Sequence, residues 1–401
     1  MNDKYNIHTH IFTGHCAPKD FLQVGIDLGD GVSSLLKWLF LTKPVAWLIT
    51  KFGGLFPNKT LQFLKIGVMA SQEDVFVNLK SAYDNSAHSG IRMVALSIDM
   101  DYMTDSNQKP KQDFEAQIQE VNKLKKSYPN NLFPFYGVDP RNPAIGNLDK
   151  IKEALESNTF AGIKLYPPNG FFPFDPRLDK LYEYAQENKI PIMTHCTRGG
   201  SYYIGKKVWS VIPDHPASLN PSHPIMTKIV KRIAAYKNAS DKSYRENAKA
   251  CNLFSHPDNY LPVLAKYPKL KLCIAHMGGD IEILGAKNPN AKHATWSKKA
   301  MILEGCTETW YDIIKNEILT DPYPNTFTDI SYSLSDANCM ATLFEDLQSG
   351  KINTGRVLFG TDYFMVTKED AELKVIATAE NHLKQYFPSM MNENNKRFLF
   401  R

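Results

Sequence analysis

The chain has 401 residues, of which 43% are hydrophobic and 22% are charged, the composition of an ordinary globular protein. Its six cysteines are scattered and form no CxxC pair, which excludes a zinc ribbon or a small disulfide scaffold and favours reduced thiols in the cytoplasm. The net charge of +5 is small for this length, although residues 201–300 contain 16 Lys and Arg but only six Asp and Glu. No nucleic-acid-binding motif accompanies this local excess of positive charge, so we expect no nucleic-acid partner.

Eight short apolar runs, each bounded by turn residues, alternate along the chain with segments of helical periodicity. The runs lie at Tyr5–His10, Arg92–Met100, Leu132–Val138, Ala161–Tyr166, Ile190–His195, Lys271–His276, Thr326–Ser331 and Arg356–Asp362. Helices are predicted at Glu73–His88, Asp113–Ser127, Asp149–Ser157 and Asp179–Asn188. Alternation of this kind indicates parallel βα units, and eight of them predict one α/β domain over residues 1–401, a (β/α)8 TIM-type barrel.

Three intervals between the runs are too long for a single helix: residues 11–70, 197–269 and 277–325. Each follows the carboxyl end of a predicted strand, where the loops of such a barrel build the active-site face. We therefore expect helical insertions that act as lids or pocket walls.

The first of these intervals contains the most apolar stretch of the chain, residues 31–56, which is interrupted by three lysines and a proline. It never reaches the ~20 uninterrupted apolar residues that a membrane span requires. We interpret it as buried helices or a contact between subunits, which is compatible with a homo-oligomer, and we expect no membrane span. The N-terminal residues also lack the order of a signal peptide, in keeping with a cytoplasmic protein.

The first predicted strand carries two histidines, His8 and His10, separated by one residue. The two-residue period of a strand places both side chains on one face, so they can approach the same metal ion. By the same alternation we expect Ile7 and Thr9 to face the helices.

Three other predicted strands end in an ionisable side chain, namely His195, His276 and Asp362. Such a group at the end of a buried strand is costly unless a charge satisfies it, so four of these strands converging on one mouth predict a bound cation. The ligand set His8, His10, His195 and Asp362 suits one divalent ion, favouring Zn²⁺ and accommodating Mn²⁺, Fe²⁺ or Co²⁺. The ion would activate a water at neutral pH, and Asp362 can accept the proton.

Several motifs carry a resemblance that covers most of the chain. They are IHTH at residues 7–10, GIKLYP at 162–167, PIMTH at 191–195, DISY at 329–332 and VLFGTDY at 357–363. In this order they resemble the amidohydrolase superfamily, in particular its family 2 branch of metal-dependent hydrolases similar to aminocarboxymuconate-semialdehyde decarboxylase. The resemblance implies that the four residues above bind the metal, that Asp362 is catalytic, and that His276 is a catalytic acid/base or electrophile beside them.

Two cations are candidates for binding a substrate carboxylate. Lys164 lies on the fourth predicted strand, where binuclear amidohydrolases carry a carboxylated lysine between two metals, but the family 2 branch usually works with one metal. We therefore expect an uncarboxylated Lys164 in contact with substrate, and Arg198, three residues after His195, is a second anion contact. The expected partner is a small, anionic organic molecule.

Three functions are compatible with these residues. The first, which the sequence favours, is hydrolysis of an amide, lactone or ester of a small carboxylated molecule by a metal-activated water, because it needs only the metal, a water and Asp362. The second is non-oxidative decarboxylation or hydration at the same site. The third is a non-catalytic metal-binding barrel, which the proposed acid and base disfavour.

Overall fold

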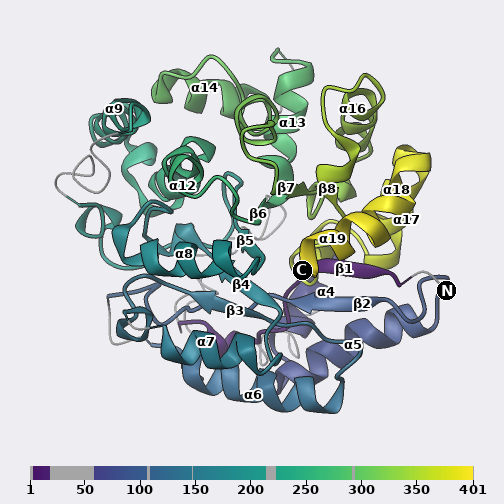
Figure 1. Ribbon diagram of the computed structural model, residues 1–401. Helices are drawn as coiled ribbons and strands as arrows, with labels where there is room; N and C mark the ends of the chain where they lie inside the picture. Colours follow the sequence, from purple (N-terminus) through teal and green to yellow (C-terminus); the bar gives the residue numbers. More distant parts are fainter. Residues whose placement is uncertain are drawn as a thin grey trace.

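A ring of parallel strands surrounded by helices forms the computed structural model, which describes residues 3–18, 58–105, 109–146, 148–213, 223–290 and 294–400 (Figure 1). The strands of this part of the chain are β1 (Tyr5–Thr9), β2 (Arg92–Ala95), β3 (Phe135–Val138), β4 (Gly162–Leu165), β5 (Ile192–Thr194), β6 (Leu272–Ile274), β7 (Thr326–Asp329) and β8 (Val357–Leu358). Each one lies within a predicted run.

The strands close into a barrel. β1 pairs with β2, and β3 to β8 pair in sequence order, always in parallel. Two joints complete the ring: the Ile7 N–H donates to the Phe359 carbonyl at 3.1 Å, and the Met93 N–H donates to the Asn131 carbonyl at 2.8 Å. The predicted (β/α)8 barrel is therefore confirmed.

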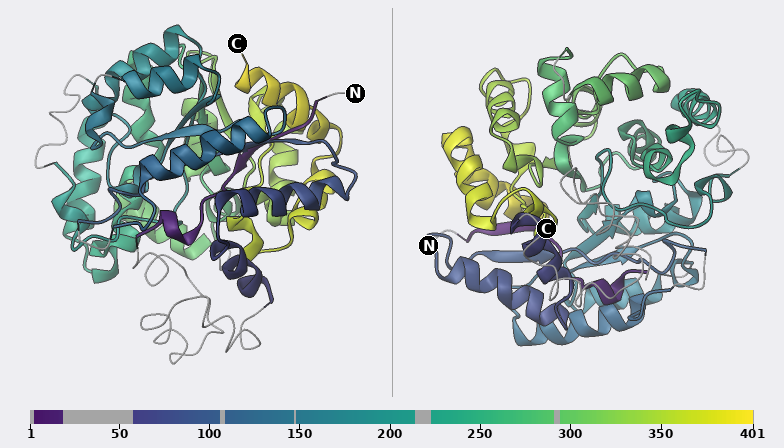
Figure 2. Two further views of the ribbon diagram at one scale, coloured as in Figure 1. Left: turned by 90° about the horizontal axis from the view of Figure 1, so that it is seen from below. Right: turned by 180° about the vertical axis from the view of Figure 1, so that it is seen from behind.

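Helices follow one another around the ring of strands (Figures 1 and 2). Their bounds are α4 (Asn58–Gly67), α5 (Gln72–Asp84), α6 (Phe114–Ser127), α7 (Asp149–Glu156), α8 (Asp179–Glu187), α9 (Ile225–Lys237), α10 (Asn247–Ala250), α11 (Asn252–Ser255), α12 (Leu261–Lys266), α13 (Asp280–Lys287), α14 (Ala294–Glu304), α15 (Trp310–Ile313), α16 (Ala337–Gln348), α17 (Glu372–Leu383), α18 (Phe387–Ser389) and α19 (Asn395–Leu399).

The sequence contains the signals that start several of these helices. Ser71 caps α5 and forms a capping box with Asp74, and Asp113 caps α6 by accepting the Ala116 N–H. A side-chain oxygen at this position satisfies one of the amides that a helix leaves unpaired at its N-terminus. The four helices predicted between strands are found within a few residues of their expected ends.

The centre of the barrel holds a hydrophobic cluster. Lys164, Met193, Cys273 and Phe327 are successive register partners from β4 to β7, so their side chains point to the same face. The three uncharged members belong to a buried cluster that includes Phe398 of α19. The face shared by these residues is therefore the barrel interior, and α19 packs against it.

Strict alternation fails in β1. Ile7 belongs to the interior cluster and does not face the helices as predicted, because the register between β1 and β2 shifts between Asn6 and Thr9. A shift of this kind adds a residue to one strand and re-aims the side chains beyond it. It brings His8 to the interior directly after Ile7.

The long intervals after β5 and β6 contain α9 to α12 and α13 to α15, and α4 follows β1. Residues 19–57, which include the apolar stretch at 31–56, lie outside the described residues. Among the helices that are described, none is long and apolar enough to cross a membrane.

Candidate metal centre

The ligands predicted on β1 and after β8 meet at the seam where these strands close the barrel. The Asp362 N–H donates to the His8 carbonyl at 2.8 Å, which sets the two residues side by side. Asp362 has a φ of 64° and His276 a φ of 67°, in the left-handed region that residues with side chains rarely adopt. Backbone of this kind is concentrated at functional sites, where the surrounding structure holds it in place.

Three side-chain atoms that can bind a metal ion converge at this seam. The Oδ1 atom of Asp362 lies 3.5 Å from His8 Nε2 and 3.3 Å from His10 Nε2. Two ligands that are each ~2.1 Å from an ion and arranged tetrahedrally lie about 3.4 Å apart, so these separations fit the edges of a metal polyhedron. The three residues are grouped closely enough to share one ion, and all three are buried.

The hydrogen bonds of the two histidines determine which nitrogen faces this point. His8 Nδ1 lies 2.8 Å from Asp329 Oδ2, and His10 Nδ1 lies 3.1 Å from the Leu96 carbonyl. Both partners are acceptors, so each Nδ1 carries the proton and each Nε2 keeps a lone pair. Partners that orient a histidine in this way are typical of metal sites.

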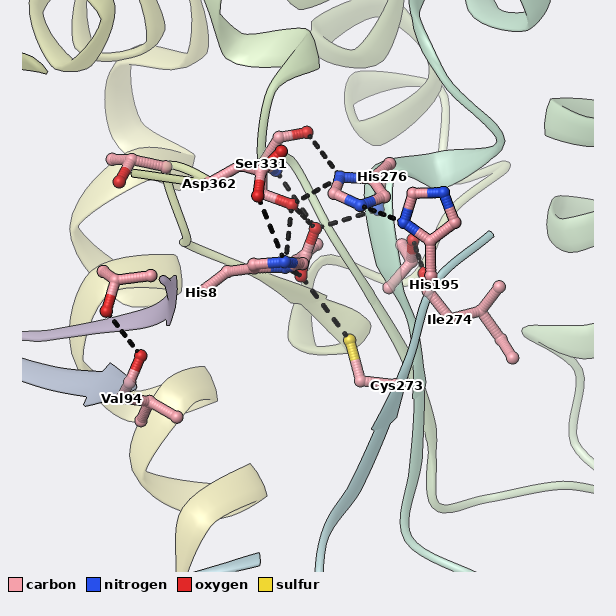
Figure 3. A network of polar contacts seen from close by, with 12 residues as sticks. His8, Val94, His195, Cys273, Ile274, His276, Ser331 and Asp362 are labelled. Carbon is pink, nitrogen blue, oxygen red and sulfur yellow. Dashed lines mark hydrogen bonds and ion pairs between the residues drawn. The ribbon is translucent and has the colours of Figure 1, made fainter. Parts of the chain in front are cut away.

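His195 joins the site through His276, and the two rings lie next to each other (Figure 3). His195 Nδ1 is 3.2 Å from His276 Nε2, while His276 Nδ1 faces the Ser331 carbonyl at 3.2 Å. Because that carbonyl is an acceptor, His276 Nδ1 carries the proton, His276 Nε2 accepts a hydrogen bond from the His195 Nδ1–H, and His195 Nε2 is left with a lone pair. That atom is buried and finds no hydrogen-bond partner within the described part of the chain.

His195 therefore offers a nitrogen of the expected kind, but it lies outside the compact group formed by His8, His10 and Asp362. His276 has both ring nitrogens engaged. In this arrangement it orients His195, and a role in acid–base catalysis stays a prediction.

The electrostatics keep the imidazoles neutral, as metal ligands must be. Burial, with the nearby Lys164 ammonium, lowers the pKa of His8 to about 3. Burial also lowers the pKa of His10 and takes that of His195 well below its usual range. Burial alone would raise the pKa of Asp362, but the surrounding imidazoles of His10, His8 and His276 outweigh it and hold the pKa of this carboxyl below its usual range.

Lys164 lies on β4, close enough to this group for its charge to lower the pKa of His8 and His10. Its side chain is buried, and its Nζ has no hydrogen-bond partner among the residues that the structure describes. Burial lowers its pKa to about 8, against the opposing effect of Asp362 and Asp329. A buried ammonium without a partner is costly, so a group that accepts a hydrogen bond from the Lys164 Nζ would be stabilised in this site.

Arg198 has a different environment from the one predicted. Its Nε donates to Glu282 at 2.8 Å, and its two terminal nitrogens donate to Glu304 at 2.6 Å each. The guanidinium also lies 4.3 Å from the centre of the Trp310 ring. These contacts argue against a role in binding a substrate carboxylate and indicate that Arg198 ties the loop after β5 to α13 and α14.

Sequence analysis missed two residues of the site, Asp329 and Ser331. Asp329 also accepts the His276 N–H at 2.9 Å, and the Ser331 hydroxyl donates to Asp329 and contacts His276 Nδ1 at 2.8 Å. They hold the rings of His8 and His276 in one network (Figure 3). Their signal in the sequence was the DISY motif at residues 329–332, which ends the seventh predicted strand but whose residues were given no role.

Apart from the two groups that contain His8, one with His10 and Asp362 and one with His276 and Asp329, possible ligands also gather at His256, Asp258 and Cys306. The buried Arg232 guanidinium donates to Asp258 and lies 3.8 Å from the Cys306 sulfur. A fixed positive charge in this position disfavours a cation, so we assign no metal there.

Comparison with known proteins agrees with the barrel and its motifs. A family model described as Amidohydrolase (Amidohydro_2) matches residues 94–384, whereas no curated protein matches the chain. The chain is similar to a solved structure of 5-carboxyvanillate decarboxylase from Novosphingobium aromaticivorans in complex with manganese and 4-hydroxy-3-methoxy-5-nitrobenzoic acid, with 12% identity, a TM-score of 0.53, and coverage of 99% of this chain and 96% of the other.

A mutant of that decarboxylase, also with bound manganese, gives 12% identity and a TM-score of 0.51 over 99% of this chain and 97% of the other. Likeness at this level of identity shows a shared fold. The family model, in contrast, extends from β2 to the end of α17 and takes in the motifs that hold His195, His276 and Asp362. The chain belongs to the amidohydrolase family.

Proposed function

We propose that the protein is a metal-dependent enzyme that holds one divalent ion with His8, His10, His195 and Asp362. The support is the set of hydrogen bonds that leaves the Nε2 atom of each histidine with its lone pair free, together with the position of the His8 and His10 atoms next to the ionised Asp362 carboxylate. Nitrogen-rich sites of this kind favour Zn²⁺ and also accept Mn²⁺, the ion in the similar decarboxylase.

When bound, the ion supplies positive charge that polarises a substrate oxygen or lowers the pKa of water. The side chain of Asp362 is 9% exposed, against 5% for His10 and none for His8, so its carboxylate is not fully enclosed by the protein. It can hold a proton at its carboxylate during the reaction.

We propose further that the substrate is a small carboxylated molecule and that its carboxylate binds the Lys164 ammonium. The unpartnered Nζ beside the ligands carries this proposal. With Arg198 engaged by two glutamates, Lys164 is the remaining cation of the two predicted from the sequence. We expect it to be uncarboxylated.

The reaction that this placement favours is non-oxidative decarboxylation. The C–CO2⁻ bond breaks, its electron pair stays on carbon, that carbon takes one proton, and CO2 leaves. A carboxylate held beside the ion by Lys164 is the group positioned to leave. The reaction named for the similar structures is also a decarboxylation.

Hydrolysis is the second candidate, favoured by the partly exposed carboxylate of Asp362 beside the histidines. In that reaction Asp362 takes a proton from water as the oxygen attacks an amide, lactone or ester carbonyl. A substrate carboxylate would then orient the molecule without taking part.

The test is to incubate the metal-loaded protein with lactones, amides, and aromatic or enol carboxylic acids, following CO2 and acid release separately. We expect CO2 from a carboxylic acid without hydrolysis. Acid release without CO2 would replace decarboxylation by hydrolysis, and turnover of neither class would reject both.

The role of Lys164 is tested with a matched pair of variants. Lys164→Met should raise KM for the carboxylated substrate by roughly 10–100-fold, the effect of losing a charged hydrogen bond. Lys271→Met is the control, because Lys271 is also buried but donates to the Arg397 and Phe400 carbonyls, away from the centre. Equal KM values in the two variants would refute the contact.

A further inference from the structure

The side chain of Asn6 lies behind the metal centre, on the helix side of the seam between β1 and β8. It is fully buried. Its Oδ1 accepts the His8 N–H at 3.2 Å and the Thr361 N–H at 3.1 Å. One of these amides belongs to a proposed ligand and the other to the residue before Asp362.

The amide nitrogen of Asn6 extends the same network outward. Nδ2 donates to Thr361 Oγ1 at 2.8 Å, to the Tyr83 hydroxyl at 2.8 Å and to Glu372 Oε1 at 3.4 Å. Tyr83 is on α5 and Glu372 is the first residue of α17, the helices on either side of β1 (Figure 1). A single side chain thus connects two strands and two helices.

Strand pairing is irregular at this seam. β3 and β4 share four consecutive register pairs, whereas β1 joins the segment that follows β8. That connection consists of the isolated bridge between Thr9 and Tyr363 and of main-chain hydrogen bonds such as those from Ile7 to Phe359 and from Asp362 to His8. The register shift in β1 begins at Asn6 itself. Where a ladder is interrupted, buried amides need other acceptors, and the Asn6 carbonyl oxygen provides one for each strand.

We propose that Asn6 is a positioning residue that sets the separation of His8 and Asp362 and so determines the affinity of the metal centre. This inference rests on the proposed metal site. Because His8 Nε2 and Asp362 Oδ1 lie only 3.5 Å apart, a small displacement of either strand changes the distance at which both can reach one ion.

The chain offers a matched control in Asn395. This buried asparagine also bridges β1 and β8: its Nδ2 donates to the Tyr5 carbonyl at 2.9 Å and the Phe359 carbonyl at 2.8 Å, and its Oδ1 accepts the Phe359 N–H at 3.1 Å. Its contacts lie at the other end of the seam, and none reaches a proposed ligand. Loss of Asn395 removes a buried bridge without touching the ends of the strands that carry the site.

The experiment is titration of the metal-free proteins with Zn²⁺ in competition with a chromophoric chelator, with thermal unfolding measured on the same samples. Asn6→Ala should weaken Zn²⁺ binding by at least roughly 10-fold, as for residues that orient metal ligands. Asn395→Ala should unfold at a lower temperature and bind Zn²⁺ as the wild type does. Equal affinity in both variants, or equal loss in both, would overturn the inference.

A milder variant keeps the inference testable if Asn6→Ala does not fold. Thr361→Val removes the hydroxyl that receives the Asn6 amide and preserves the shape of the side chain. It should weaken Zn²⁺ binding in the same direction, and wild-type affinity would count against the inference. A wild-type chain that binds no Zn²⁺ would instead refute the proposed metal site and remove the basis of the inference, whereas unchanged affinity in all variants would refute the inference alone.

Discussion

Substitution of Asp329 by asparagine tests whether the tautomer of His8 prepares the site for metal. One oxygen of Asp329 receives three donors: the N–H of His276 at 2.9 Å, the N–H of Ser331 at 3.1 Å and the Ser331 hydroxyl. The other receives His8 Nδ1 at 2.8 Å. The N–H groups of His276 and Ser331 can only donate. In Asp329→Asn they therefore require the side-chain carbonyl oxygen at their position, and the amide nitrogen takes the position of the other oxygen.

The amide nitrogen then faces His8 Nδ1, which must give up its proton to accept it. The proton moves to Nε2, the atom that lies 3.5 Å from Asp362 and would otherwise bind the ion. Loss of an orienting partner of this kind weakens metal binding by roughly 10–100-fold, or about 1.4–2.8 kcal/mol.

The assay is Zn²⁺ titration of Asp329→Asn beside Asp346→Asn. Asp346 is also buried and accepts the Tyr311 hydroxyl at 2.9 Å, but it lies on α16. We expect weaker binding in the first variant alone. Wild-type affinity in Asp329→Asn would refute the reasoning from the tautomer.

Three further predictions follow from the site and its surroundings. His276→Asn should keep the metal and lose most activity, roughly 10²–10⁴-fold as for a general acid or base; loss of the metal in a folded variant, measured by elemental analysis, would point to ligation by His276. Arg198→Met leaves two buried carboxylates unpaired, so denaturant unfolding should show a loss of about 3–5 kcal/mol with KM for a carboxylated substrate unchanged, and a raised KM would restore the anion contact. Burial raises the pKa of Glu372 from 4.5 to about 7, so the folded state binds more protons than the unfolded state between these values. Raising the pH through this window should therefore destabilise the wild type relative to Glu372→Gln by up to about 3 kcal/mol, and parallel stability curves would contradict the shift. Among the described residues, Tyr83, Tyr363 and Asp362 are ionisable groups that interact with this carboxyl.

The strands and their order could be predicted because each is a short apolar run that ends in a turn or a polar residue. The position of Ile7 could not, since alternation assumes a regular strand and the register shift in β1 depends on pairing with β2. A single sequence does not show which residues of two strands are hydrogen-bonded to each other.

The strand-end position of the ligand candidates was visible in the same runs, because an ionisable residue there breaks an apolar pattern. The partners of Arg198 were not visible. Glu282 and Glu304 lie 84 and 106 residues further along the chain, on helices whose packing against the loop after β5 is a tertiary property. The same reason hid the role of Asp329, 321 residues from the histidine that it orients.

The metal content of the purified protein tests the central claim most directly. Protein purified without added metal and analysed by elemental mass spectrometry should contain about one equivalent of a divalent ion per chain. The His8→Ala/His10→Ala variant, checked for folding by circular dichroism, should contain none, because it lacks two of the three converging donors. Full occupancy in the folded double variant, or a wild-type chain that cannot be loaded with any divalent ion, would contradict the account.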